Sequence, residues 1–538
     1  MARVVSLTAT DGQKVEYVDD GVPMSGNMKD VYWSPDRSSV VAFFRDLPDS
    51  NASERLERLV GDWRRNIFER EGGERYRELF RWPERIVEHG GRTGLVFPAY
   101  DRKFYFSGGP WDGVEKRADW FSMPRNFSVN IPAESRGTLR DHVLTCMMLC
   151  RAVGRLHAAG LALADLSAFR LLVDPPTGSA CVLGTDQVVV PGLFPPEVLG
   201  SLACMAPEVV AASYLPFGFS GRSLPSVETN LHSLAVLVYG LLLHRHPLEG
   251  SAVWSLDSDE QESLMMGKKA LFIEHPDDPA NRLRPDAGRE DCLVREDFVP
   301  WKDTGKVPFS VLGPHLGGLF LDAFVKGLHD PRLRPAAGDW EDALARTMDL
   351  MVPCPGADCP AGWVVVTDPS RMPVCPLCGT PWGYPSLPYL DLQFSRDGVK
   401  SFPDGGRLVG YEGRAVRPWH ADRDIPPERD VLPGRRAPSD RDVTADSGIP
   451  SDHDIPANRG VHAGGPAASG PGTVAEFLFR EGKWFLVNRG LDSLEDLASG
   501  KRLPLDVGIA LSHGQELVLS RAAGGRTVVV GLASFPEG

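Results

Sequence analysis

Residues 161–174 read LALADLSAFRLLVD, a stretch in which two carboxylates, Asp165 and Asp174, and one cation, Arg170, stand among mostly apolar residues. The chain before it begins with short alternating segments over residues 1–45, separated by Asp-Gly and Ser-Pro-Asp turns, which are typical of strands. A charged segment at 51–80 then carries apolar residues three or four positions apart, which predicts a helix. Helical patterns dominate the stretch that follows. A small strand-rich lobe before a larger helical one predicts the α+β class.

Four short motifs stand around this stretch in a fixed order. They are LHAAGLALADLS, MAPE, NLHSLAVLVYG and HDPRLRPAA. They resemble the catalytic loop, the Ala-Pro-Glu element, the buried helix and the late arginine of protein kinases. The resemblance implies a bilobal kinase-like domain over residues 1–350, with a small lobe at 1–100 and a large lobe at 101–350. It also implies that Glu208, which ends MAPE, forms an ion pair with Arg334.

Longer stretches narrow the resemblance to one family. MKDVYWSPDRSSVVAFFRD, VVVPGLFPPEVLG and MGKKALFIEHP are similar to bacterial Ser/Thr kinase-like proteins from tellurite-resistance and chemical-stress gene clusters. The resemblance implies a zinc ribbon and a β-rich tail behind the kinase domain. It also implies two protein partners, a von Willebrand A-type protein and a metal-dependent protein phosphatase.

The metal-binding positions of a kinase are altered in this sequence. Phosphoryl transfer needs a carboxylate that orients the hydroxyl, and an Asn and an Asp that hold Mg²⁺. The carboxylate is Asp165, but Arg170 stands in place of the Asn and Gly184 in place of the Asp. The nearest remaining carboxylate is Asp186. A guanidinium is a permanently charged donor, so it cannot bind Mg²⁺. Two anchoring positions also differ: Leu163 replaces a histidine and Asn230 replaces an aspartate.

The phosphate-binding loop is altered as well. The segment GVPMSGNMKDVY keeps Gly21 and Gly26, but Lys29 occupies the position of the third glycine. The third strand offers Arg45 as its basic residue. A guanidinium fork differs from a lysine ammonium in size and direction, so this exchange is not conservative.

These changes together predict a pseudokinase that acts in signalling or assembly within a stress-response system. They leave ATP open as a cofactor and argue against Mg²⁺. The alternative is an active Ser/Thr protein kinase, with Asp165 as base, Asp186 as its metal ligand and Arg170 in place of one cation. A purely structural role remains open for Asp165, as it does for Arg45 and Lys29.

Four cysteines in the segment 351–384 have the spacing C-x4-C-x15-C-x2-C. Two closely spaced pairs joined by a hairpin place four sulfur atoms at tetrahedral spacing, which predicts a structural zinc ribbon. The ligands would be Cys354, Cys359, Cys375 and Cys378. The alternative is four free thiols, and an iron–sulfur cluster fits the pattern less well.

The last part of the chain alternates in the manner of strands over 385–429 and 473–538. It resembles a forkhead-associated domain, a β-sandwich that reads phosphothreonine. Arg414, His420, Arg423 and Asn488 are the candidate phosphopeptide residues. The usual Ser-x-x-His is absent, so a sandwich that only contacts partners is the alternative to a phosphopeptide-binding adaptor. The segment 430–472 lacks Phe, Trp and Tyr, which predicts a disordered linker or insertion.

Composition narrows the class of protein further. The net charge of −14 over 538 residues argues against a general nucleic-acid binder. The longest apolar run, LAVLVYGLLL from Leu234 to Leu243, is too short to span a bilayer. No signal-peptide pattern opens the chain, and the cysteine usage fits a reducing compartment. We therefore expect a cytoplasmic protein.

Overall fold

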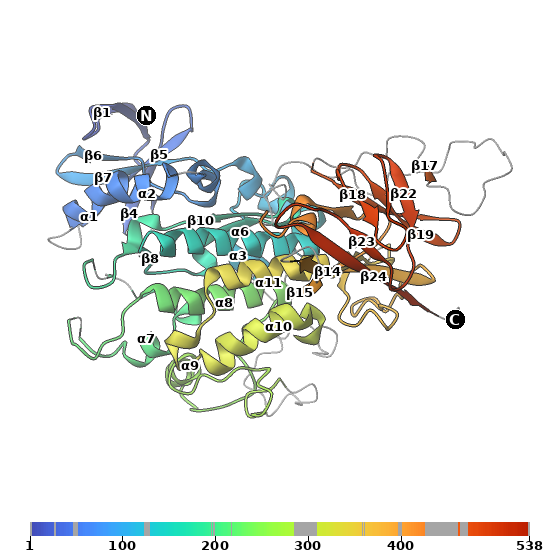
Figure 1. Ribbon diagram of the computed structural model, residues 1–538. Coiled ribbons are helices and arrows are strands. Elements are labelled where there is room, and N and C mark those ends of the chain that lie inside the picture. Colours follow the sequence, from blue (N-terminus) through green and yellow to red (C-terminus); the bar gives the residue numbers. More distant parts are fainter. Residues whose placement is uncertain are drawn as a thin grey trace. The chain divides into compact units, whose positions relative to one another are not determined.

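The structure is a computed structural model of the chain (Figure 1). It describes residues 3–25, 28–46, 52–70, 72–122, 130–194, 196, 199–216, 218–283, 309–357, 359, 361–395, 401–425, 461–462 and 472–535. The chain divides into two compact units. The larger unit holds residues 1–137, 141–309 and 316–342, and the second holds 138–140, 310–315 and 343–538.

The larger unit begins with a five-stranded antiparallel sheet in the order β3-β4-β5-β7-β6. Its strands are β3 (Met24–Ser25), β4 (Lys29–Trp33), β5 (Ser39–Phe44), β6 (Arg85–His89) and β7 (Arg92–Pro98). β5 is buried from Val40 to Phe44, because the hairpin of β1 (Arg3–Thr8) and β2 (Lys14–Asp19) packs its Tyr17 against Phe43 on one side. β5 is therefore a central strand, and its opposite face is also buried.

One helical segment connects β5 to β6. It consists of α1 (Ala52–Arg58), a π-helical turn (Leu59–Trp63) and α2 (Arg64–Phe68). The turn contains Gly61, whose backbone angles are not helical, so the segment is kinked there. The amphipathic spacing predicted for residues 51–80 buries Leu56 and Ile67.

Helices make up most of the rest of the larger unit. They are α3 (Ala118–Ser122), α5 (Ala133–Arg136), α6 (Leu139–Ala158), α7 (Pro207–Ala211), α8 (Val227–Leu243), α9 (Ser258–Met266), α10 (Gly313–Leu321) and α11 (Ala337–Asp349). The first residues of α6 and α10 and the last residues of α11 are assigned to the second unit. α8 begins at a capping box formed by Ser226 and Thr229 and is buried nearly all round, so it is a core helix of this unit. In the described part of the chain, no helix has both the length and the apolar character needed to cross a membrane.

Two short two-stranded sheets lie between α6 and α7. β9 (Leu171–Asp174) and β10 (Ser179–Val182) form a hairpin, and β8 (Ala162–Leu163) pairs with β11 (Val188–Val189) on either side of it in the sequence. A five-stranded sheet with one helical segment before its fourth strand, then a long helix, two short strand pairs and a buried helix, is the order of elements in a protein kinase. The larger unit therefore has a kinase-like fold.

The second unit is rich in strands. β12 (Met351–Pro353) pairs with β13 (Trp363–Val365). A six-stranded sheet has the order β15-β14-β24-β23-β20-β21, and a five-stranded sheet has the order β16-β18-β19-β22-β17. The strands are β14 (Ser386–Ser395), β15 (Ser401–Val409), β16 (Ala415–Val416), β17 (Val461–His462), β18 (Ala475–Arg480), β19 (Lys483–Asn488), β20 (Glu495–Asp496), β21 (Lys501–Arg502), β22 (Val507–Ala510), β23 (Glu516–Val518) and β24 (Arg526–Ser534). The buried indole of Trp484 on β19 donates to the carbonyl of Ser386 on β14, which links the two sheets.

The predicted linker at 430–472 falls almost wholly outside the described residues. Within it the structure describes β17, which pairs with β22, and Gly472.

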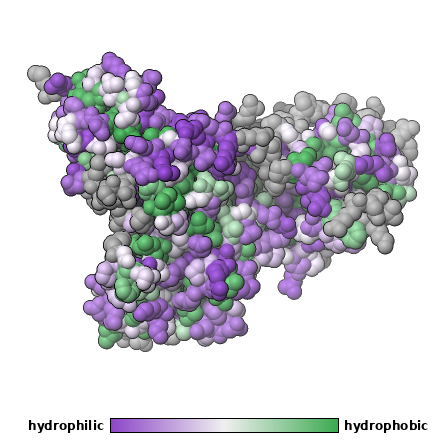
Figure 2. Space-filling model, turned by 60° about the vertical axis from the view of Figure 1, so that its left-hand side comes forward, coloured by the Kyte–Doolittle hydropathy of each residue, from purple (hydrophilic) through white to green (hydrophobic). Residues whose placement is uncertain are grey.

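On the face seen in Figure 2, hydrophobic residues lie in small groups among hydrophilic ones, as is usual at a protein surface. Because the hydrophobic groups in this view do not single out a binding site, the candidate site is described from its polar contacts.

Candidate functional site

A buried ion pair joins the five-stranded sheet to the turn after β10. The Nζ of Lys29, at the start of β4, lies 2.5 Å from Oδ2 of Asp186. The ammonium also lies over the rings of Phe44 and Phe97. Burial raises the pKa of Asp186, but the charge and hydrogen bond of Lys29, followed by the charge of Arg170, lower the pKa further, to below its usual value. Asp186 is thus held as a carboxylate.

The local backbone explains how Asp186 reaches this position. Gly184 has φ +71°, a left-handed conformation that glycine adopts without strain, and a single 3-10 turn follows it. Thr185, in that turn, is buried and its hydroxyl donates to the carbonyl of Arg81 at 2.6 Å. The glycine and the anchored threonine turn the next side chain, Asp186, toward Lys29.

Arg45 lies on the other face of the sheet from Lys29. Its guanidinium donates to Asp30 at 3.0 Å, and Arg92 donates to the same carboxylate at 2.7 Å. In the β4–β5 register Lys29 stands opposite Phe44 and Asp30 stands opposite Phe43. Because successive side chains of a strand alternate between faces, side chains on the face that carries Asp30, Arg45 among them, cannot reach Asp186. Of the two candidate phosphate-binding cations, Lys29 therefore lies beside Asp186, and Arg45 lies on the opposite face of the sheet.

Of the two predicted loop glycines, only Gly21 belongs to the described residues. It has φ +78°, and its amide donates to the side chain of Asp19 in an exposed turn before β3. Gly26 lies outside the described residues.

Both carboxylate oxygens of Asp165 have partners. Oδ1 accepts from the amide of Ser201 at 3.0 Å, and Oδ2 lies 3.5 Å from Nε of Arg170. The segment before α7 approaches closely here, since a Cβ at Gly200 would come within 2.8 Å of the carbonyl of Ala164. The side chain of Arg170 is the more exposed member of the pair, at 43% against 14%. The carboxylate that would orient a substrate hydroxyl is thus covered by one amide and faced by one cation.

The anchor of the catalytic loop is an amide. The backbone N–H of Leu163 donates to Oδ1 of Asn230 at 2.7 Å, and Nδ2 of Asn230 donates to the carbonyl of Leu163 at 2.8 Å. A carboxylate could only accept, whereas an amide donates and accepts at the same residue. Asn230 therefore still anchors this loop to α8, although the sequence suggested a lost anchor.

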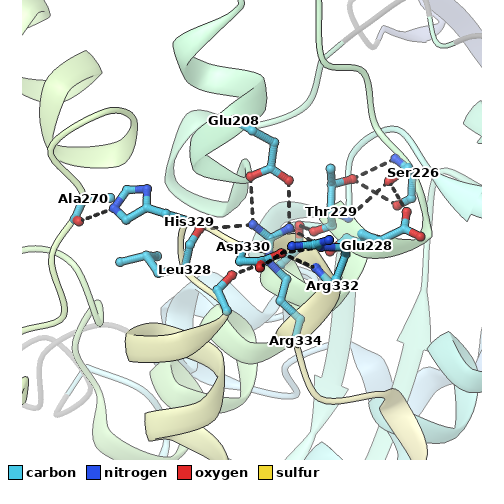
Figure 3. A network of polar contacts seen from close by, with 12 residues as sticks. Glu208, Ser226, Glu228, Thr229, Ala270, Leu328, His329, Asp330, Arg332 and Arg334 are labelled. Carbon is cyan, nitrogen blue, oxygen red and sulfur yellow. Dashed lines mark hydrogen bonds and ion pairs between the residues drawn. The ribbon is translucent and has the colours of Figure 1, made fainter.

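The ion pair between Glu208 and Arg334 is present and bidentate (Figure 3), with both N–O distances at 2.8 Å. The guanidinium also donates to the carbonyls of Gly327, Glu228 and Leu328 at 2.9, 2.9 and 3.2 Å. The Arg334 side chain is 1% exposed. One buried cation thus ties together α7, the start of α8 and the segment that precedes α11.

The folded protein should lose stability between pH 6.5 and pH 4 through His157 on α6. Burial lowers the pKa of His157 to about 4, against weaker opposition from a hydrogen bond to Asn230 and the charge of Glu228. The unfolded chain, with a pKa of about 6.5, binds the proton first, so the free energy of unfolding falls as the pH falls through this window and is unaffected above it.

The check is urea denaturation at pH 7 and pH 5. We expect the wild-type protein to lose about 1–2 kcal/mol more than His157→Gln, whose amide does not titrate. Equal losses in the two proteins would contradict the assignment.

The four late cysteines lie close enough together to bind a metal ion such as zinc. Their sulfur atoms all lie within 4.8 Å of one another, and the pairs Cys354–Cys378 and Cys359–Cys375 are each 3.5 Å apart. Tetrahedral zinc with Zn–S bonds of about 2.3 Å requires sulfur–sulfur distances of roughly 3.8 Å. The thiols therefore fit a closed site with four cysteine ligands, which leaves no open position for catalysis.

Two tight turns present these sulfurs. After Cys375 the chain turns so that the amide of Gly379, at φ +73°, donates to the carbonyl of Cys375, and the amide of Cys375 donates to the carbonyl of Thr380. Gly356 lies in the other turn, where an added Cβ would come within 2.9 Å of the sulfur of Cys378. Both turns need glycine, one for its conformation and one for the approach of the sulfur.

The proposed phosphopeptide residues do not form one open site. Arg414 donates to Asp349 at 3.0 Å, and Nε2 of His420 lies 3.1 Å from the same oxygen. Both side chains are at least nine-tenths buried. A phosphate would therefore have to displace Asp349, a negative group already seated between these two donors.

Asn488 and Arg423 are used elsewhere. Both polar side-chain atoms of Asn488 are engaged within the second unit, where the residue donates to Leu491 and Leu503 and accepts from the amides of Gly490 and Leu491. Arg423 is half-exposed and lies over a phenylalanine ring. Asn488 is thus a buried structural residue.

The chain was compared with family models, with curated proteins and with solved structures. No family model matches the chain, and no curated protein matches it. Among solved structures, a rhoptry kinase from Toxoplasma gondii has a TM-score of 0.38 at 12% identity, covering 64% of this chain and 84% of that one. ROP2 from Toxoplasma gondii, a virulence factor described as having a protein-kinase fold and no enzymatic activity, has a TM-score of 0.37 at 12% identity, covering 63% and 82%. The order of elements, the sheet register and the Glu208–Arg334 pair give the larger unit its kinase-like fold.

Proposed function

We propose that the chain is a kinase-fold signalling or scaffold protein that binds a nucleotide through Lys29 and does not transfer phosphate efficiently. The observation that carries the proposal is the state of Asp165, whose oxygens face Arg170 and the amide of Ser201. A hydroxyl that approaches this carboxylate competes with the Ser201 amide at one oxygen and with the Arg170 cation at the other. The residue at one Mg²⁺ position also supports the proposal, because Arg170 is a cation where an oxygen ligand would be needed.

Lys29 would hold the phosphates of a bound nucleotide, and Arg170 would supply a second, fixed positive charge nearby. A nucleotide brings its own negative charge into this cleft, and those two cations can balance part of it without a metal ion. Neither can align an in-line transfer as a bridging Mg²⁺ does. We therefore expect binding that does not require Mg²⁺.

The experiment is calorimetric titration of the purified protein with ATP, in Mg²⁺ and in EDTA. The affinity should agree within about twofold between the two conditions, and Lys29→Met should weaken it by about tenfold or more. The matched control is Arg45→Met, which removes a cation of the same sheet that lies on its other face, and it should change affinity by less than about twofold. If Arg45→Met weakened ATP binding as much as Lys29→Met does, the result would contradict the proposed site.

A radiolabel transfer assay on a general acceptor protein tests the absence of chemistry, with Asp165→Ala as the control. We expect the unmodified protein and the control to give the same low signal. Mg²⁺-dependent transfer that disappears in Asp165→Ala would instead support an active Ser/Thr kinase. The pair of Lys29 and Asp186 is the observation that favours this second candidate, because it keeps a phosphate-binding cation beside a carboxylate able to bind metal.

The second unit would then serve assembly. We propose that its four cysteines bind structural zinc and that its two sheets form a forkhead-associated-like sandwich that contacts partner proteins. A role in a cytoplasmic stress-response system, with a von Willebrand A-type protein and a metal-dependent phosphatase as partners, is proposed from the family resemblance alone.

A further inference from the structure

A cavity of about 300 Å³ lies in the larger unit, and neither Lys29 nor Asp165 lines it. Its walls come from α2, the 3-10 turn Gly73–Leu79, the segment after β7 and the 3-10 turn Arg102–Phe104. The volume is at the lower end of the range for small-molecule sites, about 300–1,000 Å³. It suits a ligand of one ring with a few attached atoms better than a polypeptide segment.

The floor of the cavity is aromatic and rigid. Phe68, Phe80 and Trp82 contact one another edge to face, with ring centroids 5.9 to 6.2 Å apart. The indole of Trp82 donates to the carbonyl of Leu59 at 2.8 Å, which fixes the orientation of its ring. This preformed set of rings gives one side of the cavity an apolar, aromatic lining that suits contact with a planar aromatic ligand.

Positive charge surrounds this floor. Arg64 and Arg77 both place their guanidinium groups over the ring of Phe68, at 6.0 and 5.5 Å, and Arg81 lies over Tyr100 at 4.5 Å. Among the described contacts, neither Arg77 nor Arg81 has a carboxylate partner, and the nearest carboxylates to Arg64 are 3.7 and 3.8 Å away. Two cations over one ring repel each other, so an anion between them would be stabilised.

The carboxylates that line the cavity do not cancel this charge. Glu78 lies 3.5 Å from Lys103, Glu84 is the 3.7 Å partner of Arg64, and Asp101 accepts from the backbone amide of Lys103. Four cations and three carboxylates line the cavity, so the lining keeps a net positive charge. Glu78 and Glu84 are paired with cations, whereas the partner of Asp101 is a neutral amide. Arg77 and Arg81, without a carboxylate partner among the described contacts, both line the space that a ligand would fill.

We propose that this cavity binds a small aromatic anion, that is, a planar ring carrying a phosphate or carboxylate group. The ring would lie on the aromatic floor, and the anionic group would receive charge-assisted hydrogen bonds from Arg77 and Arg81. Neither Lys29 nor Asp165 lines this cavity, so the proposal does not rest on the function proposed for those two residues.

The test is calorimetric titration of the full chain with three probes: phenyl phosphate, inorganic phosphate and phenol. If the ring and the charge are both recognised, phenyl phosphate binds at least about tenfold more tightly than either of the other two. Equal affinity for phenyl phosphate and inorganic phosphate would overturn the proposal, and so would the absence of heat at millimolar phenyl phosphate. A blocked phosphotyrosine peptide that bound more tightly than phenyl phosphate would overturn the small-molecule assignment.

Two variants locate the binding. Arg77→Gln and Arg81→Gln should each weaken phenyl phosphate binding by about tenfold, and Arg77 is exposed on its turn, so its replacement should not disturb folding. The control is Arg102→Gln, an exposed arginine of the neighbouring turn that does not line the cavity. Lys29→Met should leave phenyl phosphate binding within about twofold, because Lys29 lies outside the cavity. Loss of phenyl phosphate binding in Arg102→Gln or Lys29→Met would contradict the site. Unchanged binding in both Arg77→Gln and Arg81→Gln would contradict it as well.

Discussion

The Arg334→Ala variant should be less stable than the wild-type protein by about 3–5 kcal/mol, the usual cost of removing one partner from a buried ion pair. The change leaves the carboxylate of Glu208 without its bidentate partner and three backbone carbonyls without their donor. Because those groups belong to α7, the start of α8 and the segment before α11, the loss affects the core of the larger unit. Urea denaturation followed by circular dichroism measures it.

Arg332→Ala is the matched control, because it removes an arginine only two residues away. That side chain is 85% exposed and pairs with Asp330 at the surface. Exposed pairs contribute little, so the change should stay within about 0.5 kcal/mol. Similar losses in the two variants would show that the buried network does not carry the stability assigned to it.

The second large effect concerns metal content. Wild-type protein should contain about one zinc ion per chain, and Cys375→Ser should contain almost none. Cys375 is the most buried of the four cysteines, and its sulfur lies 3.5 Å from that of Cys359, so its loss opens the site from the inside. The ribbon has little core of its own, and losing the metal should also unfold it locally.

Metal analysis of the purified proteins measures the content, and alkylation of native protein reports local unfolding. Cys204→Ala is the control, since that cysteine is buried in the larger unit and should leave the zinc content unchanged. Wild-type protein without zinc, with all four late thiols freely alkylated, would refute the site. Full zinc content in Cys375→Ser would also contradict this ligand set.

The sequence predicted contacts that depend on residue type and motif order. The Glu208–Arg334 pair followed from the order of two motifs, and the cysteine cluster followed from spacing alone. Neither of these two predictions changes if the boundary of a predicted strand is shifted by one residue. Which of the two candidate cations lies beside Asp186 was not predictable in this way, because a step of one residue along a strand moves a side chain to the other face of the sheet.

Two further features depend on local geometry that a single sequence does not show. Asp186 stands two positions after the expected one, and the positive φ of Gly184 with the turn behind it brings the side chain back toward Lys29. Asn230 was interpreted as a lost anchor because aspartate is the familiar residue there. An amide of the same shape forms hydrogen bonds with both the N–H and the carbonyl of Leu163, which residue identity alone did not indicate.

The pairing of β14 with β24 has a consequence for how the second unit is made. The two strands align over nine residue pairs, from Ser386 with Ser534 to Phe394 with Arg526. Every other strand of the two sheets lies between them in the sequence. During translation β14 leaves the ribosome before β24, and one edge of β14 stays unpaired until β24 has been synthesised. Folding of this unit should therefore lag behind its own translation, whereas the larger unit can fold as its chain appears.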